Sequence, residues 1–354
     1  MNLKVDLVPP TKRKPKPKDS LKLAFGSTFT DHMFTMCYRN GQWSDPQIGP
    51  YQPLSLDPAA MVLHYGQGIF EGMKAYRRAG KVCLFRPRDN IMRLNASARR
   101  MVMPEVDVDF VLECLKELVK TEKDWIPELP GTSLYIRPTM IAVEPKLGVR
   151  ASQEYLFYII VGPVGPYFPE GFNPLKIMVS DKYVRAVRGG VGFSKTMGNY
   201  AASLLGWKEA SDAGCSQVLW LDAIERKYIE ETSTMNVFIK FEKELATQPL
   251  DGTILPGITR DSVIRIAKDW KLTVNERRIS IDEIIEGAKS GKVKEVFGAG
   301  TAAIIAPIGE LVYQGKSIVV SGGKTGELTR KLYDELTALQ CGEGKDKYGW
   351  VVSL

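Results

Sequence analysis

The sequence is poor in histidine and in closely spaced cysteines, and this scarcity excludes several kinds of site. It contains two histidines, His32 and His64, and five cysteines, none of which forms a CxxC pair. A metal site based on these histidines would need carboxylates as its remaining ligands, and no HExxH or CxxC pattern is present. An odd number of scattered cysteines is typical of reduced thiols in a cytosolic protein. We therefore expect no metal site and a cytoplasmic protein.

Long hydrophobic runs are also missing. The longest apolar stretches, such as YLFYIIVG at 155–162, are far shorter than the roughly 20 residues of a membrane-spanning helix. The start MNLKVDLVPP lacks the continuous apolar core of a signal peptide, and its acidic residue and prolines argue against a transit peptide. We expect no membrane segment.

The formal charge of +7 is concentrated at one end of the chain, because residues 1–20 alone carry a net charge of +4. The run TKRKPKPKDS at 11–20 alternates lysine with proline, and proline prevents a regular helix. Such a run is more typical of a solvated, extended arm than of a nucleic-acid-binding tail. The body of the protein carries little excess charge, so we expect no nucleic-acid partner.

At 354 residues and 44% hydrophobic composition, the chain exceeds the size at which a single core stops growing. Helical and strand-like segments alternate without a regular βαβ pattern, which favours an α+β fold over a doubly wound sheet. Glycine and proline are concentrated in GPVGPYFPEGFNP at 162–174. We predict a small α/β domain with a basic arm at 1–165, a linker at 166–174 and a large domain at 175–354.

Several segments have clear local patterns. Helices are expected at 86–104 with Asp89 as N-cap, at 107–125, after an Asn199 cap at 201–213, and after Pro256 with Thr259 as cap. Gly214 provides a stop for the third of these helices. Strands are expected at 134–143, 154–165, 175–180, 217–222 and 235–240.

Lysine is the residue whose surroundings indicate chemistry. Lys195 lies in RGGVGFSKTMGNYAASL at 188–204, among glycines and small or apolar residues and without a compensating charge nearby. Glycine lets a backbone approach a ligand closely, and a lysine desolvated among apolar groups has a lowered pKa. A neutral amine attacks carbonyls, so Lys195 is a candidate Schiff-base lysine, although most lysines are simply exposed.

A Schiff-base lysine that used pyridoxal 5′-phosphate would need a phosphate site and a carboxylate for the pyridine nitrogen. The helix start at Thr259 and a small turn at 298–301 in GAGT both offer backbone N–H groups to an anion. The carboxylate is provided by Glu230 or Glu231, at the end of the segment YIEETST. None of these signals is specific by itself.

Six segments together resemble the branched-chain amino acid aminotransferases of the fold type IV, D-amino acid aminotransferase-like, enzymes. They are FEGMKAYR, YIRPTMIA, GGVGFSKTMGNYAASL, YIEETSTMNVF, LPGITRDS and FGAGTAA, and they occur in the family's order. The resemblance extends from FTDHM to KYGW, nearly the whole chain. It implies a two-domain architecture whose large domain carries the lysine, pyridoxal 5′-phosphate as cofactor, and a homodimer.

The resemblance also assigns roles around the cofactor. It implies that Lys195 forms the Schiff base and moves the proton, and that Tyr200 binds the phenolic oxygen. It selects Glu231 over Glu230 for the ring nitrogen, because the family's acid lies five residues before the position of Asn236. Arg93 matches the arginine that grips the phosphate. The other matching cofactor positions are Arg185, Thr234, Leu255, Gly257, Ile258, Thr259 and Thr301.

The expected substrates are L-leucine, L-isoleucine or L-valine with 2-oxoglutarate, giving branched-chain 2-oxo acids and L-glutamate. Tyr135 and Arg137 resemble the pair that receives a carboxylate, and the amides of Thr301 and Ala302 would hold the α-carboxylate. The resemblance implies an apolar wall made of Phe70, Tyr65 and Tyr167. From the residues alone, core packing is the favoured explanation of these aromatic side chains.

The sequence leaves other interpretations open. A D-amino acid aminotransferase or aminodeoxychorismate lyase would share Lys195 and Glu231, but the segments FTDHM and YIRP argue against both. A non-catalytic protein that binds the cofactor is hard to reconcile with Lys195, Glu231 and Arg93 together. Ala303 and Ala306 occupy the places where mammalian members have a CxxC pair, so no thiol switch is expected there.

Overall fold

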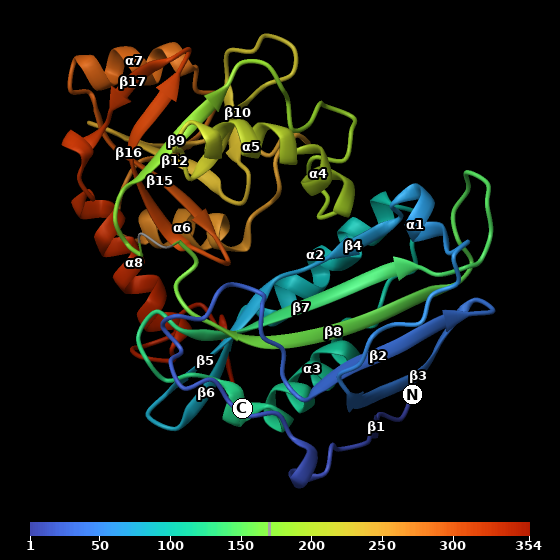
Figure 1. Ribbon diagram of the computed structural model, residues 1–354. Helices are drawn as coiled ribbons and strands as arrows, with labels where there is room; N and C mark the ends of the chain where they lie inside the picture. Colours follow the sequence, from blue (N-terminus) through green and yellow to red (C-terminus); the bar gives the residue numbers. More distant parts are fainter. Residues whose placement is uncertain (169–170) are drawn as a thin grey trace. The chain divides into compact units, whose positions relative to one another are not determined.

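The chain is seen in a computed structural model that describes residues 1–168 and 171–354 (Figure 1). Its contacts divide it into two compact units. The first unit comprises Met1–Tyr167, Ser194–Met197 and Ala338–Leu354, and the second comprises Phe168–Phe193 and Gly198–Thr337. Lys195 therefore groups with the first unit. The predicted domain boundaries stay a prediction, and positions 169–170 of the predicted linker lie outside the described residues.

A nine-stranded sheet forms the frame of the first unit. Its order is β1-β3-β2-β8-β7-β5-β6-β18, with β4 paired to β7, and only β1 and β3 run parallel. The strands are β1 Lys4–Val5, β2 His32–Arg39, β3 Gln42–Pro50, β4 Gly68–Phe70, β5 Met73–Arg78, β6 Lys81–Phe85, β7 Ser133–Ala142, β8 Tyr155–Val164 and β18 Val351–Ser353.

Helices cover the apolar face of this sheet. They are α1 Met61–Tyr65, α2 Pro87–Arg100 and α3 Val108–Thr121, with short 3₁₀ turns η1 Pro10–Lys12 and η2 Lys123–Trp125. In α3, residues at helical spacing such as Val111, Leu115 and Leu118 are buried, and Asp107 caps the helix by accepting from the backbone of Phe110. They pack in one core with alternate residues of β8, as the periodicity predicts.

The second unit is built on another nine-stranded sheet, in which six strands close into a ring. The order is β11-β10-β9-β16-β15-β12-β13-β14, β17 pairs with β16, and β11 also pairs with β12. The strands are β9 Leu175–Ser180, β10 Gln217–Leu221, β11 Ile229–Thr232, β12 Asn236–Phe241, β13 Leu245–Thr247, β14 Val274–Glu276, β15 Val293–Gly300, β16 Ile304–Tyr313 and β17 Lys316–Val319.

The remaining helices are α4 Met197–Ala202, α5 Leu204–Asp212, α6 Ile258–Asp269, α7 Ile281–Lys289 and α8 Glu327–Gln340, with the 3₁₀ turn η3 Ser321–Gly323. The mixture of helices with largely antiparallel sheets confirms the predicted α+β class. Among the residues that the structure describes, no helix is long and apolar enough to span a membrane.

Three predicted helix caps are wrong. Asp89 lies in the first turn of α2, where Arg86 is the N-cap residue and pairs with it at 2.5 Å. The helix begins earlier than predicted because a proline at its first position has a φ angle suited to a helix. Asn199 lies inside α4, and Thr259 follows the first residue of α6, whose N-cap is Gly257.

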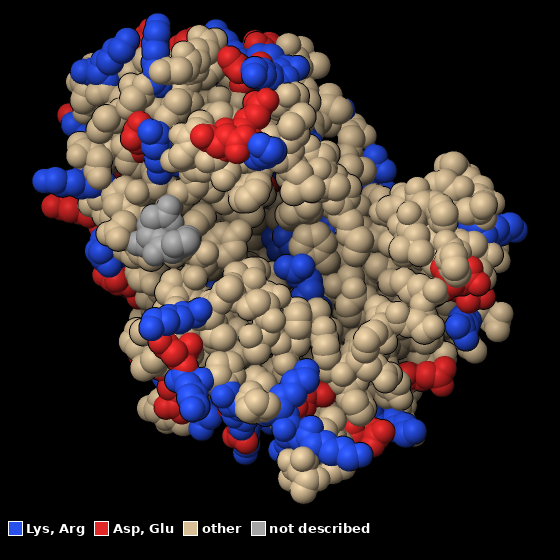
Figure 2. Space-filling view, in the orientation of Figure 1, with Lys and Arg blue, Asp and Glu red and all other residues tan. Residues whose placement is uncertain are grey.

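The basic N-terminal arm is hydrogen-bonded to the first unit, and is not simply solvated as predicted. The backbone of Val8 donates to His32 Nε2 at 2.8 Å, and that of Lys14 donates to Asp31 Oδ1 at 2.8 Å. The residues between the prolines of the arm still have backbone N–H groups, and these can donate hydrogen bonds to the rest of the first unit. On the face drawn in Figure 2, basic and acidic side chains lie side by side and form no broad patch of one sign.

The close approach of the segment around Thr28 to β8 predicts one strongly destabilising substitution. A Cβ at Gly162 would lie 2.0 Å from the backbone oxygen of Thr28, which cannot swing away as a side chain can. We expect Gly162→Ala to lower the free energy of unfolding by about 1–3 kcal/mol. Gly49→Ala, in β3 of the same sheet, has no atom within 4 Å and is the matched control. Equal urea midpoints for the two variants would contradict the prediction.

Candidate active site

The backbone of Lys195 is fixed by two segments of the first unit. Its N–H donates to Ser97 Oγ in α2 at 2.9 Å, and its carbonyl accepts from the N–H of Phe70 in β4 at 3.0 Å. The next residue, Thr196, forms a β-bridge with Ile69 and donates its hydroxyl to the carbonyl of Gly68 at 3.0 Å. Lys195 and Thr196 therefore pair with the edge of β4, and hydrogen bonds of its own N–H and carbonyl hold the backbone of Lys195 in place.

The glycines before Lys195 mainly serve the folding of the chain itself. A Cβ at Gly192 would lie 2.3 Å from the carbonyl oxygen of Thr253, and Gly189 has a φ of +81° that other residues rarely adopt. Gly198, on the other side of the lysine, has open space around it. The predicted close approach of these glycines to a ligand stays a prediction, because the close neighbour of Gly192 is protein backbone.

The side chains of Lys195 and Arg137 both lie against the ring of Phe70. Lys195 Nζ is 4.9 Å from the ring centroid, and the guanidinium carbon of Arg137 is 4.6 Å from it. Arg137 Nη2 also donates to the hydroxyl of Tyr135 at 2.9 Å. Tyr135 and Arg137 are two residues apart in β7, so they face the same side of the sheet. The side chains of Lys195 and Arg137 thus share one aromatic ring, and Arg137 is also bound to the hydroxyl of Tyr135.

Aromatic residues from the rest of the first unit extend this cluster. Phe25 lies 4.6 Å from Tyr135 and 5.1 Å from Tyr167, both measured between ring centroids and both edge to face. No sequence pattern singles out Phe25, which comes from an irregular segment. Tyr65, at the end of α1, is 40% exposed, and its hydroxyl accepts from the backbone of Gly148 at 2.7 Å. Its predicted role in an apolar wall stays a prediction.

Arg93 is buried in α2 and makes a bidentate ion pair. Its Nε lies 2.7 Å from Glu71 Oε1, and Nη2 donates to Glu71 Oε2 at 2.8 Å. Glu71 is fully buried, and its partnership with Arg93 was missed from the sequence although it lies in the segment FEGMKAYR. The paired geometry fixes the guanidinium plane. The phosphate-binding role of Arg93 remains a prediction.

In the second unit, Glu231 lies on the strand β11. The residue is 95% buried, and its carboxylate receives three N–H donors. Arg185 Nε lies 2.9 Å from Oε1, while Asn236 Nδ2 and the backbone of Leu255 donate to Oε2 at 3.1 and 3.0 Å. Donors of this kind stabilise the ionised form of a buried carboxyl group.

Asn236 joins this carboxylate to the segment before α6. Its amide also donates to the carbonyl of Leu255 at 3.0 Å, and its Oδ1 would lie 2.1 Å from a Cβ at Gly257. Gly257 is therefore required for close packing against a side chain that orients Glu231. In the sequence, Asn236 served only to identify Glu231 as the family's acid, so its role in orienting the Glu231 carboxylate was missed. The only sequence signal for this role is that Asn236 is a polar residue at the first position of a strand, directly after a turn.

Two backbone turns of the second unit fit an anion. The helix α6 begins at Ile258, and its N-cap residue, Gly257, has no side chain with which to cap the first turn. The N-terminus of a 12-residue helix attracts negative charge through its N–H groups and dipole. Thr301 and Ala302 lie in the three-residue turn between β15 and β16, and both are partly exposed.

The turn at 301–303 differs from the predicted turn at 298–301. Gly298 and Gly300 belong to β15, where a Cβ would lie 2.7 Å from Met235 and 2.8 Å from the carbonyl oxygen of Thr234. Ile304, which ends the turn, has a φ of +64°, an uncommon and strained value for a β-branched residue. The hydroxyl of Thr234 faces Gln217 Oε1 at 3.4 Å, and Tyr200 lies in α4.

Comparison with known proteins places this chain in a family. The Amino-transferase class IV family model matches residues 68–311. Branched-chain-amino-acid aminotransferase 2 of Bacillus subtilis (strain 168) is 54% identical over 344 residues, which cover 97% of this chain and 94% of that protein. The chain belongs to the branched-chain amino acid aminotransferases. The predicted family and the prediction of an enzyme are thereby confirmed.

Solved structures of this family share the fold. The branched-chain aminotransferase from the archaeon Thermoproteus uzoniensis with norvaline has a TM-score of 0.76 and 26% identity, and covers 91% of this chain and 99% of that chain. The T.th. branched-chain amino acid aminotransferase with pyridoxamine 5′-phosphate has a TM-score of 0.73 and 27% identity, over 90% of this chain and 97% of that chain. The type IV architecture is confirmed.

The burial of the Glu231 pair predicts a large cost when Arg185 is removed. Arg185→Met leaves a buried carboxylate without its cationic partner, which typically costs about 3–5 kcal/mol of unfolding free energy. Arg188 pairs with Asp251 at 2.7 Å, but its side chain is 63% exposed, so Arg188→Met should cost less than about 1 kcal/mol. Urea unfolding followed by circular dichroism compares the two variants. A smaller loss for Arg185→Met than for its control would refute this account.

Proposed function

We propose that this aminotransferase moves the amino group reversibly between L-leucine, L-isoleucine or L-valine and 2-oxoglutarate. The products are the branched-chain 2-oxo acid and L-glutamate. The observation that carries this proposal is the shared ring of Phe70, with the Lys195 amine on it at 4.9 Å and the Arg137 guanidinium at 4.6 Å. A reactive amine is thus placed near a cation suited to a substrate carboxylate. Near-full-length relatedness to the branched-chain enzymes supports the choice of substrate.

We propose pyridoxal 5′-phosphate as the cofactor, and the residues present fit it. The chemistry that it supplies when bound is an electron sink for charge that develops at the α-carbon of the substrate. Glu231 would accept a hydrogen bond from the ring nitrogen, and its three donors suit a carboxylate that must stay ionised. The start of α6 fits a phosphate, with N–H groups from Ile258 and Thr259.

Lys195 would hold the cofactor through its aldehyde and act as the mobile base. Its backbone is fixed by Ser97 and Phe70, so the four-carbon side chain can move the amine while the attachment point stays in place. When freed by the incoming amino acid, Nζ would take up the proton that leaves the α-carbon. Tyr200 would bind the phenolic oxygen, and Arg93 and Thr301 would contact the phosphate.

Substrate selection would come from the cluster around Arg137. Tyr135 and Arg137 would receive the distal carboxylate of glutamate, because their side chains already share a hydrogen bond at 2.9 Å. Phe70 and Tyr167 would provide apolar surface for a branched side chain. Thr301 and Ala302 would hold the α-carboxylate through their amides. We further propose a cytoplasmic homodimer, which sedimentation and cell fractionation would test.

An amino-donor panel tests the function. With 2-oxoglutarate as acceptor, L-leucine, L-isoleucine and L-valine should each form glutamate faster than D-alanine does. Lys195→Ala should lower the rate by about a thousandfold or more, because it removes the amine that moves the proton. Glutamate formation is the measured quantity. A preference for D-alanine would instead support a D-amino acid aminotransferase, and equal rates for wild type and Lys195→Ala would refute the role of the lysine.

Glu231→Gln tests the proposed contact with the ring nitrogen. The variant should bind pyridoxal 5′-phosphate, seen as an absorption band of the protein, but should turn over about a hundredfold more slowly because a neutral amide cannot stabilise a protonated nitrogen. Glu230→Gln is the matched control, since adjacent side chains on β11 point to opposite faces. The control should keep most of the wild-type turnover. Undiminished turnover of Glu231→Gln would remove the proposed role.

A further inference from the structure

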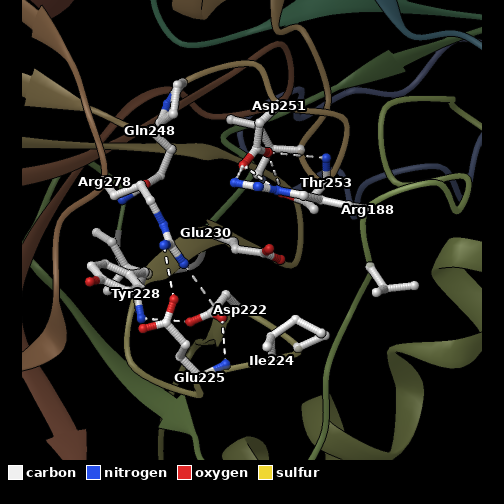
Figure 3. A pocket seen from close by; sticks show the side chains of 15 residues that line it. Arg188, Asp222, Ile224, Glu225, Tyr228, Glu230, Gln248, Asp251, Thr253 and Arg278 are labelled. Carbon is white, nitrogen blue, oxygen red and sulfur yellow. Dashed lines mark hydrogen bonds and ion pairs between the residues drawn. The ribbon is translucent and has the colours of Figure 1, made fainter.

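A cavity of about 170 Å³ lies within the second unit, on the side of β11 to which Glu230 points (Figure 3). It is lined by the turn between β10 and β11, by β11 itself, by the segment between β13 and α6, and by Val187, Arg188 and Arg278. Ile224, one of its lining residues, is 79% exposed, so the cavity is reached from solvent. Successive residues of a strand point to opposite faces, which separates this cavity from the face of Glu231.

Both arginines of the cavity are already paired with carboxylates. Arg188 donates through Nε and Nη2 to Asp251 Oδ2 at 3.1 and 2.7 Å. Arg278 donates to Glu225 Oε1 at 2.9 Å and lies over the ring of Tyr228, 3.6 Å from its centroid. Since these guanidinium groups are engaged, the cavity has little to offer an anion.

Asp222 is a further acidic residue of the wall, and its charge is held by backbone groups. Its Oδ1 accepts from the N–H groups of Lys227 and Tyr228 at 3.0 and 2.8 Å, and Oδ2 accepts from that of Glu225 at 2.8 Å. Burial by itself would raise the pKa of Asp222, but these hydrogen bonds outweigh burial and lower the pKa, so the residue is ionised at neutral pH. The wall therefore contains four carboxyl groups against two arginines.

Glu230 has one carboxyl oxygen that the described residues leave without a hydrogen-bond donor. The residue is 95% buried, and Oε2 has no hydrogen-bond partner among the described residues. The hydroxyl of the neighbouring Thr253 lies 2.9 Å from Asp251 Oδ1 and also provides a hydrogen bond to the Glu230 carboxyl group that lowers its pKa, but Oε2 itself stays without a partner. In Figure 3, Glu230 lies between the Arg188–Asp251 pair and the group of Asp222, Glu225 and Arg278. A buried carboxyl oxygen without a donor is costly, and a bound donor would remove that cost.

We propose that this cavity binds a small alkylammonium group, whose N–H donates to Glu230 Oε2. An excess of carboxylates selects a cation, and the side chains of Ile224 and Ile254 provide apolar surface for its alkyl part. A metal ion fits less well, because no group of three or more His, Cys, Asp or Glu among the described residues could hold one. The group could belong to a simple amine or to the ammonium end of an amino acid.

The ionisation of Glu230 makes this binding depend on pH. Burial raises the pKa of Glu230 to about 7; the hydrogen bond from Thr253 and the charge of Arg185 lower it, and the charges of Glu231 and Asp251 raise it. Asp222, Glu225, Arg188 and Arg278 complete the charged groups of the cavity. An ammonium ion binds the ionised carboxylate, so affinity should rise as the pH passes upward through about 7 and level off above that.

Calorimetric titration of the holoenzyme tests the proposal with two probes that cannot form an imine with an aldehyde. Trimethylammonium carries the cation alone, and N,N-dimethylglycine carries it beside a carboxylate. We expect saturable binding of at least one probe. Tighter binding of trimethylammonium indicates a simple amine as the natural ligand, and tighter binding of N,N-dimethylglycine indicates an amino acid. Absence of saturable binding of both probes at about pH 8 overturns the proposal.

Variants and pH then locate the binding site. Glu230→Gln should weaken binding about tenfold or more at pH 8 and abolish the pH dependence. Glu310→Gln, which removes a carboxylate of β16 outside the cavity, is the control and should bind as the wild type does. For the wild type, affinity should rise about tenfold from pH 6 to pH 8. Equal affinity of wild type and Glu230→Gln, or an affinity that does not change with pH, also overturns the proposal.

Discussion

The buried ion pair between Glu231 and Arg185 is the interaction on which the second unit's candidate site depends. A carboxylate out of water needs donors, and here they come from separate segments, namely Arg185 after β9, Asn236 at the start of β12 and Leu255 before α6. Satisfying one charge therefore fixes three segments. Gly257 must lack a side chain because Asn236 occupies its space, and that glycine is the N-cap residue of α6. Asn236, which binds Glu231, thus also sets the residue at the start of α6, where a phosphate would fit.

In the first unit, Lys195 is held in place by backbone hydrogen bonds and not by a buried charge. Lys195 is fixed through its own N–H and carbonyl, so the place of its α-carbon does not depend on where the amine lies. Arg93, in contrast, is held by its side chain, through the bidentate pair with Glu71. These two arrangements suit the proposed roles, since a base that carries a proton must move whereas a group that grips a phosphate should not.

The sequence predicted the parts of this protein that depend on local periodicity. The apolar face of α3 and the strands β7 and β8 could be predicted because their apolar residues recur at helical or strand spacing. The α+β class followed from the order of such segments. The helix cap at Asp89 failed because a proline starts the helix before it, and the cap at Thr259 failed because Gly257, packed against the distant Asn236, is the N-cap residue. Phe25 and Glu71 were missed for the same reason. Their partners, Tyr135 and Arg93, are far away in sequence, and no local pattern records such contacts.

The two adjacent glutamates of β11 have carboxyl groups that differ in their hydrogen-bond donors. Both are 95% buried, yet Glu231 has three donors while Glu230 has an oxygen without any among the described residues. Strand alternation places them on opposite faces, so the donors that satisfy one cannot reach the other. Composition alone left either residue possible for the ring nitrogen. The decisive difference is the set of donors, because hydrogen bonds supplied by the fold favour the ionised form of a buried carboxyl group.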